Sequence, residues 1–132
     1  MDDKHLIEIA RKAKENAYSP YSKFKVGAAL LTKNGKVYTG CNIENSSFGL
    51  SICAERVAIF KAISEGEKDF EKIVIVADTT ESIRPCGACR QVMSEFGDFE
   101  IVMVSKKNEI AKSSVRKLLP FNFNGSFLEI QH

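Results

Sequence analysis

The sequence predicts an α/β fold, a three-layer α/β/α sandwich with a mixed central sheet. Apolar residues recur at helical spacing near the N-terminus, and an Asn-Gly pair joins two runs of strand-forming residues into a hairpin. Helical stretches and apolar strands then alternate. A hairpin gives antiparallel pairing and strand–helix–strand crossovers give parallel pairing, so the sheet is expected to be mixed. With 132 residues, one domain over 1–132 is expected.

Start and stop signals bound the predicted elements. Asp2 or Asp3 can cap the first helix, and Gly66 and Gly97 can end two later ones. Asn34-Gly35 suits the positive φ angles of a tight type I′ turn. In chain order we expect a helix over 3–17, strands over 24–32 and 36–43, a helix over 53–64, a strand over 72–77, a helix over 86–96, a strand over 100–105 and a short helix from 113 or 114 to 119.

Charge and composition exclude several classes of protein. Lysine and arginine total 19 against 17 aspartate and glutamate, so no strong field favours nucleic acid or an anionic membrane. The first residues lack the cationic start and apolar run of a signal peptide, and no apolar stretch is long enough to span a bilayer. Four cysteines in such a chain indicate a reducing compartment. We expect a cytoplasmic protein without nucleic-acid or membrane partners.

Three cysteines lie at the starts of two predicted helices. Cys53-Ala54-Glu55 opens one, and Pro85-Cys86-Gly87-Ala88-Cys89 opens the next. Cys86 and Cys89 are one helical turn apart, and free amides and the helix dipole favour thiolates there. If the two helix N-termini lie level, three thiolates converge, and Zn²⁺ suits such ligands. Three protein ligands leave the fourth position open, as in catalytic zinc sites.

Two residues next to Cys53 could assist catalysis at such a zinc ion. Zinc lowers the pKa of a bound water from about 15.7 toward neutrality. Glu55 follows a ligand by two residues, so its carboxylate can take a proton from that water and pass it to a substrate nitrogen. Three thiolates leave a formal charge of about −1 on the site. Arg56 can offset this by donating hydrogen bonds to the sulfurs.

Other interpretations of the cysteines stay open. A lone Cys-x-x-Cys also occurs as a redox pair, as half of a structural zinc site, or as two buried thiols. Cys41 can complete a closed four-cysteine site, although its place late in a predicted strand favours a buried small hydrophobe. Glu55 alone is an ordinary favourable acid in a first helical turn. The combination of the two motifs favours a catalytic zinc site.

The sequence resembles the small homotetrameric cytidine deaminases of nucleoside salvage. Cys-x-Glu followed by Pro-Cys-x-x-Cys, with a glutamate that does not bind the metal, is characteristic of zinc deaminases. The resemblance covers about residues 5 to 123. It extends to the segments 20–24, 26–30, 42–45, 86–91 and 118–120.

This resemblance implies a cytidine deaminase-like fold, one Zn²⁺ per chain and a role for individual residues. Cys53, Cys86 and Cys89 match the zinc ligands, and Glu55 matches the proton shuttle. Asn42 and Glu44 match the pair that binds the sugar hydroxyls; on alternate positions of a strand end they share one face. Phe24 matches the ring on the pyrimidine. The main chain of Ala54 and Arg84 would contact the base carbonyl and the departing ammonia.

The resemblance also implies a homotetramer with shared active sites. Phe123 matches an aromatic residue that enters a neighbouring subunit's site, whereas Phe48 stands where the family often has tyrosine. Without the family, Asn42 and Glu44 would be interpreted as a polar strand exit, Phe24 as a core residue and Phe123 as a tail on its own domain.

The function expected from this resemblance is zinc-dependent hydrolysis of cytidine and deoxycytidine to uridine and deoxyuridine, with release of ammonia. Three alternatives remain open. The first is a deaminase of the same fold that acts on another aminopyrimidine. The second is a non-catalytic module stabilised by zinc, which would have four protein ligands. The third is a thiol redox protein that uses Cys86 and Cys89.

Overall fold

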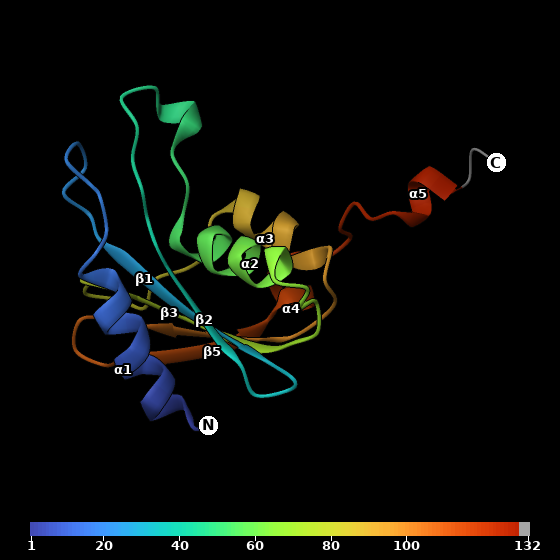
Figure 1. The fold of residues 1–132 in the computed structure, drawn as a ribbon, viewed down its shortest axis with the longest axis horizontal. Coiled ribbons are helices and arrows are strands. Elements are labelled where there is room, and N and C mark those ends of the chain that lie inside the picture. The colour runs from blue at the N-terminus through green and yellow to red at the C-terminus, as the bar shows by residue number, and fades with distance from the viewer. Residues whose placement is uncertain (130–132) are drawn as a thin grey trace.

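The structure, a computed structural model, describes residues 1–129 and has a five-stranded mixed sheet between helices (Figure 1). The strands lie in the order β2-β1-β3-β4-β5, parallel between β3 and β4 and antiparallel elsewhere. This confirms the predicted α/β class. The elements are α1 (Asp3–Lys14), β1 (Val26–Thr32), β2 (Val37–Cys41), the 3₁₀ helix η1 (Phe48–Leu50), α2 (Ala54–Ser64), β3 (Phe70–Ala77), α3 (Gly87–Ser94), β4 (Glu100–Val104), β5 (Ile110–Ser114), α4 (Val115–Leu118) and α5 (Ser126–Glu129).

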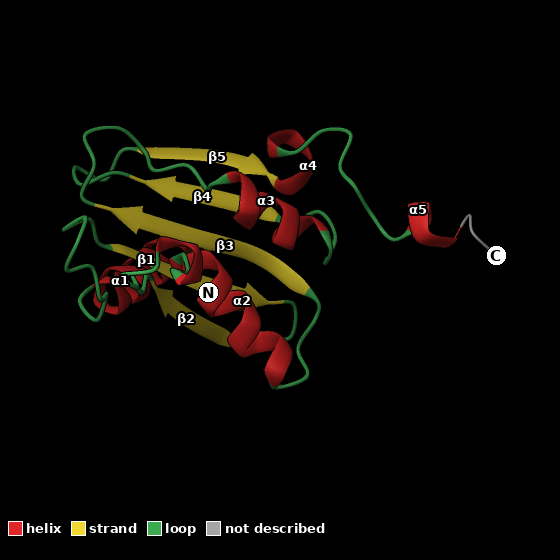
Figure 2. Cartoon of the chain, turned by 90° about the horizontal axis from the view of Figure 1, so that it is seen from above, coloured by secondary structure: helices red, strands yellow, loops and turns green. Residues whose placement is uncertain are grey.

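Alternating strand residues build two separate cores, one on each face of the sheet. Ala29, Val74 and Val102 face α1, where they pack with Leu6 and Ala10. The intervening residues of the same strands face the layer that contains α2 and α3, and all are buried. β1, β3 and β4 contribute residues to both cores, and these three strands lie in the middle of the sheet (Figure 2). No helix within residues 1–129 is both long enough and apolar enough to cross a bilayer.

Two glycines let helices approach the sheet closely. A Cβ atom at Gly27 would lie 2.1 Å from the Ala10 carbonyl oxygen of α1. A Cβ atom at Gly40 would lie 2.2 Å from the Ala54 carbonyl oxygen of α2. Only glycine fits such contacts between a strand and a helix backbone. Gly40 therefore sets the depth at which the start of α2 rests on β2.

The predicted hairpin is confirmed, but the predicted type I′ turn is wrong. Gly35 has a φ of 88°, whereas Asn34 does not have a positive φ. The Gly35 amide donates to the Thr32 carbonyl at 3.0 Å. This is a three-residue loop, a type I turn followed by a left-handed glycine. Such a loop needs only one positive φ angle, which Gly35 supplies.

The strands of the hairpin are shorter than predicted, because a side chain replaces part of the ladder. β1 begins at Val26 rather than at residue 24, and β2 ends at Cys41 rather than at residue 43. Asn42 Oδ1 accepts a hydrogen bond from the Val26 amide at 2.8 Å, and Asn42 Nδ2 donates to the Phe24 carbonyl at 2.7 Å. Cys41, predicted to be a buried hydrophobe, is only partly buried in this edge strand.

Other element boundaries differ from the prediction by a few residues. α1 ends at Lys14 instead of near residue 17, and β3 begins at Phe70 instead of at residue 72. Asp2, one of the two candidates, caps α1, and Ser114, near the expected start of the short helix, caps α4. β5 was not predicted, because its sequence is mostly polar and its side chains are exposed or half-buried at the edge of the sheet. The short η1 and α5 were not predicted either.

Candidate functional site

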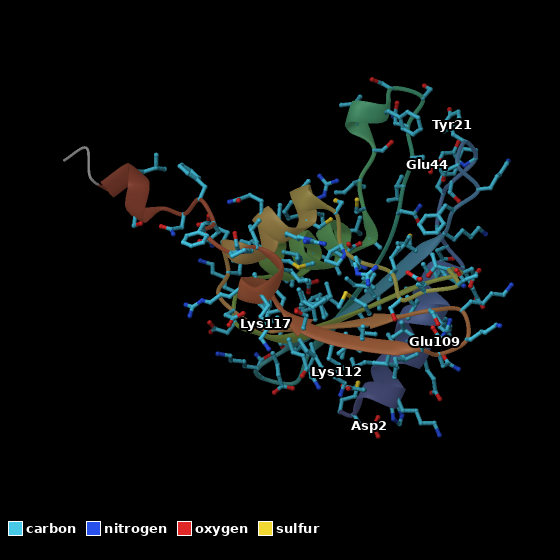
Figure 3. The ribbon with its side chains drawn as sticks, turned by 180° about the vertical axis from the view of Figure 1, so that it is seen from behind. Asp2, Tyr21, Glu44, Glu109, Lys112 and Lys117 are labelled. Carbon is cyan, nitrogen blue, oxygen red and sulfur yellow. The ribbon has the colours of Figure 1, made fainter. Side chains whose placement is uncertain are left out.

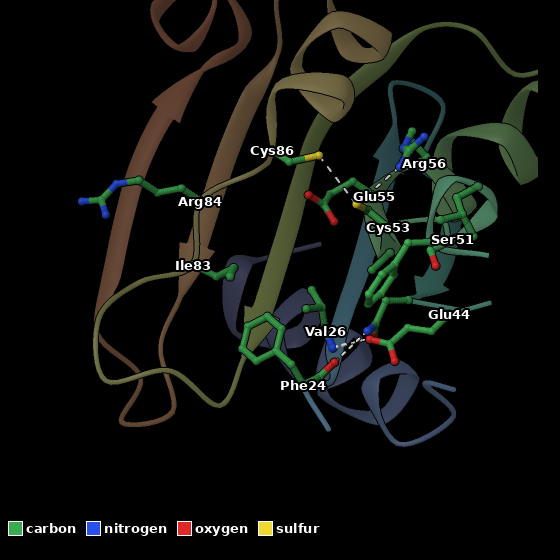
Figure 4. Close-up of a pocket in the computed structure, with 14 residues that line it drawn as sticks. Phe24, Val26, Glu44, Ser51, Cys53, Glu55, Arg56, Ile83, Arg84 and Cys86 are labelled. Carbon is green, nitrogen blue, oxygen red and sulfur yellow. Dashed lines mark hydrogen bonds between the residues drawn. The ribbon is translucent and has the colours of Figure 1, made fainter. Parts of the chain in front are cut away.

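The starts of α2 and α3 bring three cysteines together. Cys53 is the N-cap residue of α2 and Cys86 is the N-cap residue of α3, and neither side chain caps its helix. The Sγ atoms of Cys53 and Cys86 lie 3.6 Å apart (Figure 4), and those of Cys86 and Cys89 lie 3.4 Å apart. All three sulfurs lie within 4.8 Å of one another. The structure thus has the convergence that the two motifs predict.

The cysteine cluster fits a zinc ion. Zinc–sulfur bonds of about 2.3 Å in a tetrahedron place two ligand sulfurs about 3.8 Å apart, close to the two separations observed. A disulfide needs sulfurs about 2.05 Å apart, and all four cysteines are free thiols. Cys41 is not part of the group. Among the described residues, the cluster therefore offers three ligands and leaves one corner of the tetrahedron open.

Hydrogen bonds within the cluster favour a negative charge on Cys53. Contacts with the Cys89 thiol and then with Arg56 lower the pKa of Cys53 to about 5. Cys89 is the donor of that contact and is buried, so its own pKa is raised. Arg56 Nη2 lies 3.5 Å from Cys53 Sγ, and this contact raises the pKa of Arg56. The guanidinium thus lies where it can offset the charge of thiolates.

Glu55 is a buried acid beside the cluster. Its residue is 4% exposed in the first turn of α2, yet it lines the same pocket as Cys53 and Cys86. Burial, with a contribution from the charge of Cys53, raises the pKa of Glu55 to about 7. A carboxyl group with such a pKa can both accept and donate a proton near neutral pH.

A pocket of about 390 Å³ opens over this acid. Cys89 is fully buried and does not line the pocket. The sequence did not indicate Val26, Ser51, Ile52 and Ile83, which are ordinary apolar or small polar residues that only the fold brings here. The predicted residues that line the pocket are Phe24, Asn42, Glu44, Cys53, Ala54, Glu55, Arg56, Arg84 and Cys86.

Asn42 and Glu44 brace the rim of the pocket. The Glu44 carboxylate accepts hydrogen bonds from the main-chain amides of Tyr21 and Ser22, each at 3.1 Å, and from the Ser22 hydroxyl. The Ser22 hydroxyl is the main reason that the pKa of Glu44 is lowered. Figure 3 shows Tyr21 and Glu44 close together at one end of the molecule. The Asn42 side-chain amide forms hydrogen bonds with the main chain of Phe24 and Val26. Contacts within the protein therefore orient the side chains of both Asn42 and Glu44.

Arg84, Phe123 and Phe48 were also singled out from the sequence, and each lies in a different relation to the pocket. The Arg84 side chain is exposed and points away from the pocket, so only its main chain can serve the site (Figure 4). Phe123 is 58% exposed and lies outside the pocket, in a C-terminal segment that leads away from the sheet (Figure 1). Phe48 lines the pocket and packs edge-to-face on Tyr21, with ring centroids 6.4 Å apart.

Comparison with known proteins identifies the family. Residues 1–105 match the family described as the cytidine and deoxycytidylate deaminase zinc-binding region. The chain belongs to this family of zinc-binding deaminases. The match covers every residue predicted for the site except Phe123.

Individual deaminases of the family resemble the chain over nearly its whole length. Cytidine deaminase from Sporosarcina psychrophila is 50% identical over 126 residues, which are 94% of this chain and 93% of that protein. Blasticidin-S deaminase from Bacillus cereus is 33% identical over 129 residues, covering 92% and 91%. The crystal structure of cytidine deaminase from Burkholderia pseudomallei matches with a TM-score of 0.91 and 49% identity, covering 93% of this chain and all of that one.

Proposed function

We propose that this chain hydrolyses cytidine and deoxycytidine to uridine and deoxyuridine and releases ammonia. The observation that supports this most strongly is the buried carboxyl of Glu55, next to three sulfurs with zinc-ligand spacing and open to a pocket. The similarity to proteins named cytidine deaminase at about half identity supports the same reaction. Neither a redox-active cysteine pair nor a closed structural zinc site needs a buried carboxyl group beside an open coordination position.

In this proposal Cys53, Cys86 and Cys89 hold the zinc and Glu55 moves the protons. Bound zinc supplies the Lewis acidity that makes a water molecule nucleophilic near neutral pH. Glu55 accepts a proton from the attacking water and delivers it to N3 of the pyrimidine. The remaining proton of the attacking water, now on the C4 hydroxyl, then passes to the amino group, which leaves as ammonia while the C4 carbonyl forms. Water supplies the oxygen of the product and the hydrogens that balance the reaction.

The pocket walls would orient the nucleoside for this reaction. Phe24 would pack on the pyrimidine ring, and Asn42 and Glu44 would bind the sugar hydroxyls, since the rim holds their polar groups in place. The main-chain amide of Ala54, at the start of a helix without a side-chain cap, would donate to the base carbonyl. The carbonyl of Arg84 would face the departing ammonia.

We further propose a homotetramer with shared sites, in which Phe123 enters a neighbour's pocket. The exposed apolar side chains of two projecting segments support this: Phe48 and Leu50 are 69% and 73% exposed, and Phe121 and Phe123 follow α4 on the C-terminal segment. Light scattering gives the mass of the assembly. A cytoplasmic location suits the four free thiols, because metal-binding cysteines must stay reduced.

A second candidate is a deaminase of another aminopyrimidine nucleoside. The relationship to blasticidin-S deaminase, at 33% identity over most of both chains, favours keeping this candidate. Cytidine, deoxycytidine and blasticidin S should therefore be compared at equal enzyme concentration. Faster turnover of cytidine and deoxycytidine supports our proposal, whereas deamination of blasticidin S alone favours the second candidate.

The Glu55→Gln variant tests the proposed chemistry. The amide cannot carry a proton, so turnover of cytidine, followed by the ultraviolet change, should fall by about 10²- to 10⁴-fold. Zinc content, measured by mass spectrometry, should not change, since Glu55 lies outside the sulfur cluster. Glu65→Gln, at the far end of α2, is the matched control and should behave as the wild type. Near-normal deamination by Glu55→Gln would disprove the proton shuttle.

A further inference from the structure

Arg90 holds the chain on both sides of Cys86. Its main-chain amide donates to the Cys86 carbonyl at 3.0 Å, and its side-chain Nε donates to the Pro85 carbonyl at 2.9 Å. The Pro85 carbonyl belongs to the peptide bond that joins Pro85 to Cys86. One residue therefore fixes the carbonyls immediately before and immediately after the α-carbon of Cys86.

The same guanidinium is anchored on a different part of the fold. Arg90 Nη1 donates to the carbonyl of Leu118, the last residue of α4, at 3.0 Å. Leu118 packs against the core between the sheet and α2. Because a guanidinium is planar and rigid, a bond at Nη1 also fixes the direction in which Nε points. The core-bound end of α4 thus orients the group that holds the Pro85 carbonyl.

The position of Cys86 needs such support. The connection between β3 and α3, residues 78–86, contains no helix or strand. The Cys86 side chain does not cap α3, and its residue is exposed. Cys89, in contrast, is buried in the first turn of α3, where neighbouring residues restrain it. Cys53 is half-buried, and its sulfur accepts a hydrogen bond from Arg56. Cys86 is the exposed member of the cluster, so its placement depends most on bonds to its own main chain.

We propose that Arg90 is a positioning residue for the metal centre: by bridging the Pro85 and Leu118 carbonyls it keeps Cys86 in zinc-ligand geometry. Arg90 neither belongs to the cysteine group nor lines the pocket. The inference rests on the proposed zinc site but not on the identity of the substrate. Groups that orient metal ligands typically contribute about 10- to 100-fold to metal affinity.

Zinc release tests this inference without any measurement of activity. Zinc-loaded Arg90→Met is mixed with an excess of a chromogenic chelator, and the release rate is followed by absorbance. Methionine keeps an unbranched stem but cannot donate to either carbonyl. We expect release about 10- to 100-fold faster than from the wild type. Release at the wild-type rate would overturn the inference.

Arg11→Met is the matched control. Arg11 is also half-buried and also bridges separate acceptors, the Ser105 carbonyl at 3.0 Å and the Asn108 side chain, but it lies on α1, on the opposite face of the sheet. The Arg11→Met variant should be less stable than the wild type but should release zinc at the wild-type rate. Equal acceleration by Arg11→Met and Arg90→Met would show a general effect of destabilisation and overturn the inference.

A milder variant covers the case in which Arg90→Met does not fold. Arg90→Lys keeps the charge and most of the stem, but its single ammonium lacks the rigid fork that spans the two carbonyls. Its release should be faster than that of the wild type, and a wild-type rate would overturn the inference. A wild-type protein that binds no zinc would instead refute the proposed function, so the two failures are distinguishable.

Discussion

Gly40→Ala should displace the residues at the start of α2 and so lower activity, although Gly40 does not line the pocket. The new Cβ would lie 2.2 Å from the Ala54 carbonyl oxygen and 2.7 Å from the Ala58 amide nitrogen. Both atoms belong to the backbone of α2, so a side-chain rotation cannot relieve the contact. The start of α2, which carries Cys53 and Glu55, must move away from β2.

The size of this movement follows from the contact distance. Ordinary van der Waals contact begins near 3.4 Å, so the Ala54 carbonyl must retreat by about 1.2 Å. A misplacement of about 1 Å in catalytic groups can lower the rate about 10²-fold. Overpacking of this kind also costs about 1 to 3 kcal/mol of stability. We therefore expect kcat/KM to fall by about two orders of magnitude in a protein that still folds.

The assay compares Gly40→Ala with Gly27→Ala at a temperature where both are folded. A Cβ atom at Gly27 lies 2.1 Å from the Ala10 carbonyl oxygen, so the clash is of the same kind but displaces α1, on the face away from the pocket. Deamination is measured per zinc-loaded chain, and stability by urea unfolding. Gly27→Ala should lose stability and keep kcat/KM. Normal kcat/KM in Gly40→Ala, or an equal loss in Gly27→Ala, would refute the reasoning.

Further predictions concern the cysteine cluster and the surface charges. Cys41→Ala should keep its zinc in a metal count, since Cys41 is not part of the cysteine group, and loss of zinc would indicate a four-ligand structural site. Arg56→Ala should lower turnover about 10- to 100-fold while keeping zinc, because Arg56 offsets thiolate charge; unchanged turnover would remove that role. Asp3 forms hydrogen bonds with Lys72 and then with Lys112, and these hold its pKa below the usual 3.8. Its contribution to stability is thus present above pH 3.8 and is lost as the pH falls through the folded-state pKa. In urea unfolding, Asp3→Asn should therefore be less stable than the wild type at pH 6, and the difference should shrink at low pH; a difference that is independent of pH would contradict the linkage.

Local sequence signals predicted most helices and strands correctly. Asp2, Ser114, Gly66 and Gly97 mark helix ends in the structure because capping and left-handed glycine depend on adjacent residues only. The central strand β3 was evident from its apolar run, since both of its faces are buried. β5 gave no such signal, because a polar edge strand is defined by its pairing with β4.

In the candidate site, too, some features were predictable from local sequence and others depended on the tertiary fold. The chemistry of the site was recognisable from two short motifs, but the apolar and small polar residues of its pocket wall were not. Ser51, Ile52 and Ile83 have no chemical signature and reach the pocket only through the packing of connections around α2 and α3. The sequence likewise did not predict the hydrogen bonds from the Asn42 side chain to the main chain of Phe24 and Val26, which shorten both hairpin strands.

The sequence by itself determined that Cys86 and Cys89 lie about one turn apart at a helix start and that Glu55 follows Cys53 at another, because capping and helical geometry depend on residues three or four apart. Only the tertiary structure decided that the sulfurs of Cys53 and Cys86 meet at 3.6 Å. That meeting depends on two helices lying on the same face of one sheet, with Gly40 setting the depth of α2 and Arg90 holding the approach to α3. Such long-range packing is a property of the whole core, which no short segment encodes.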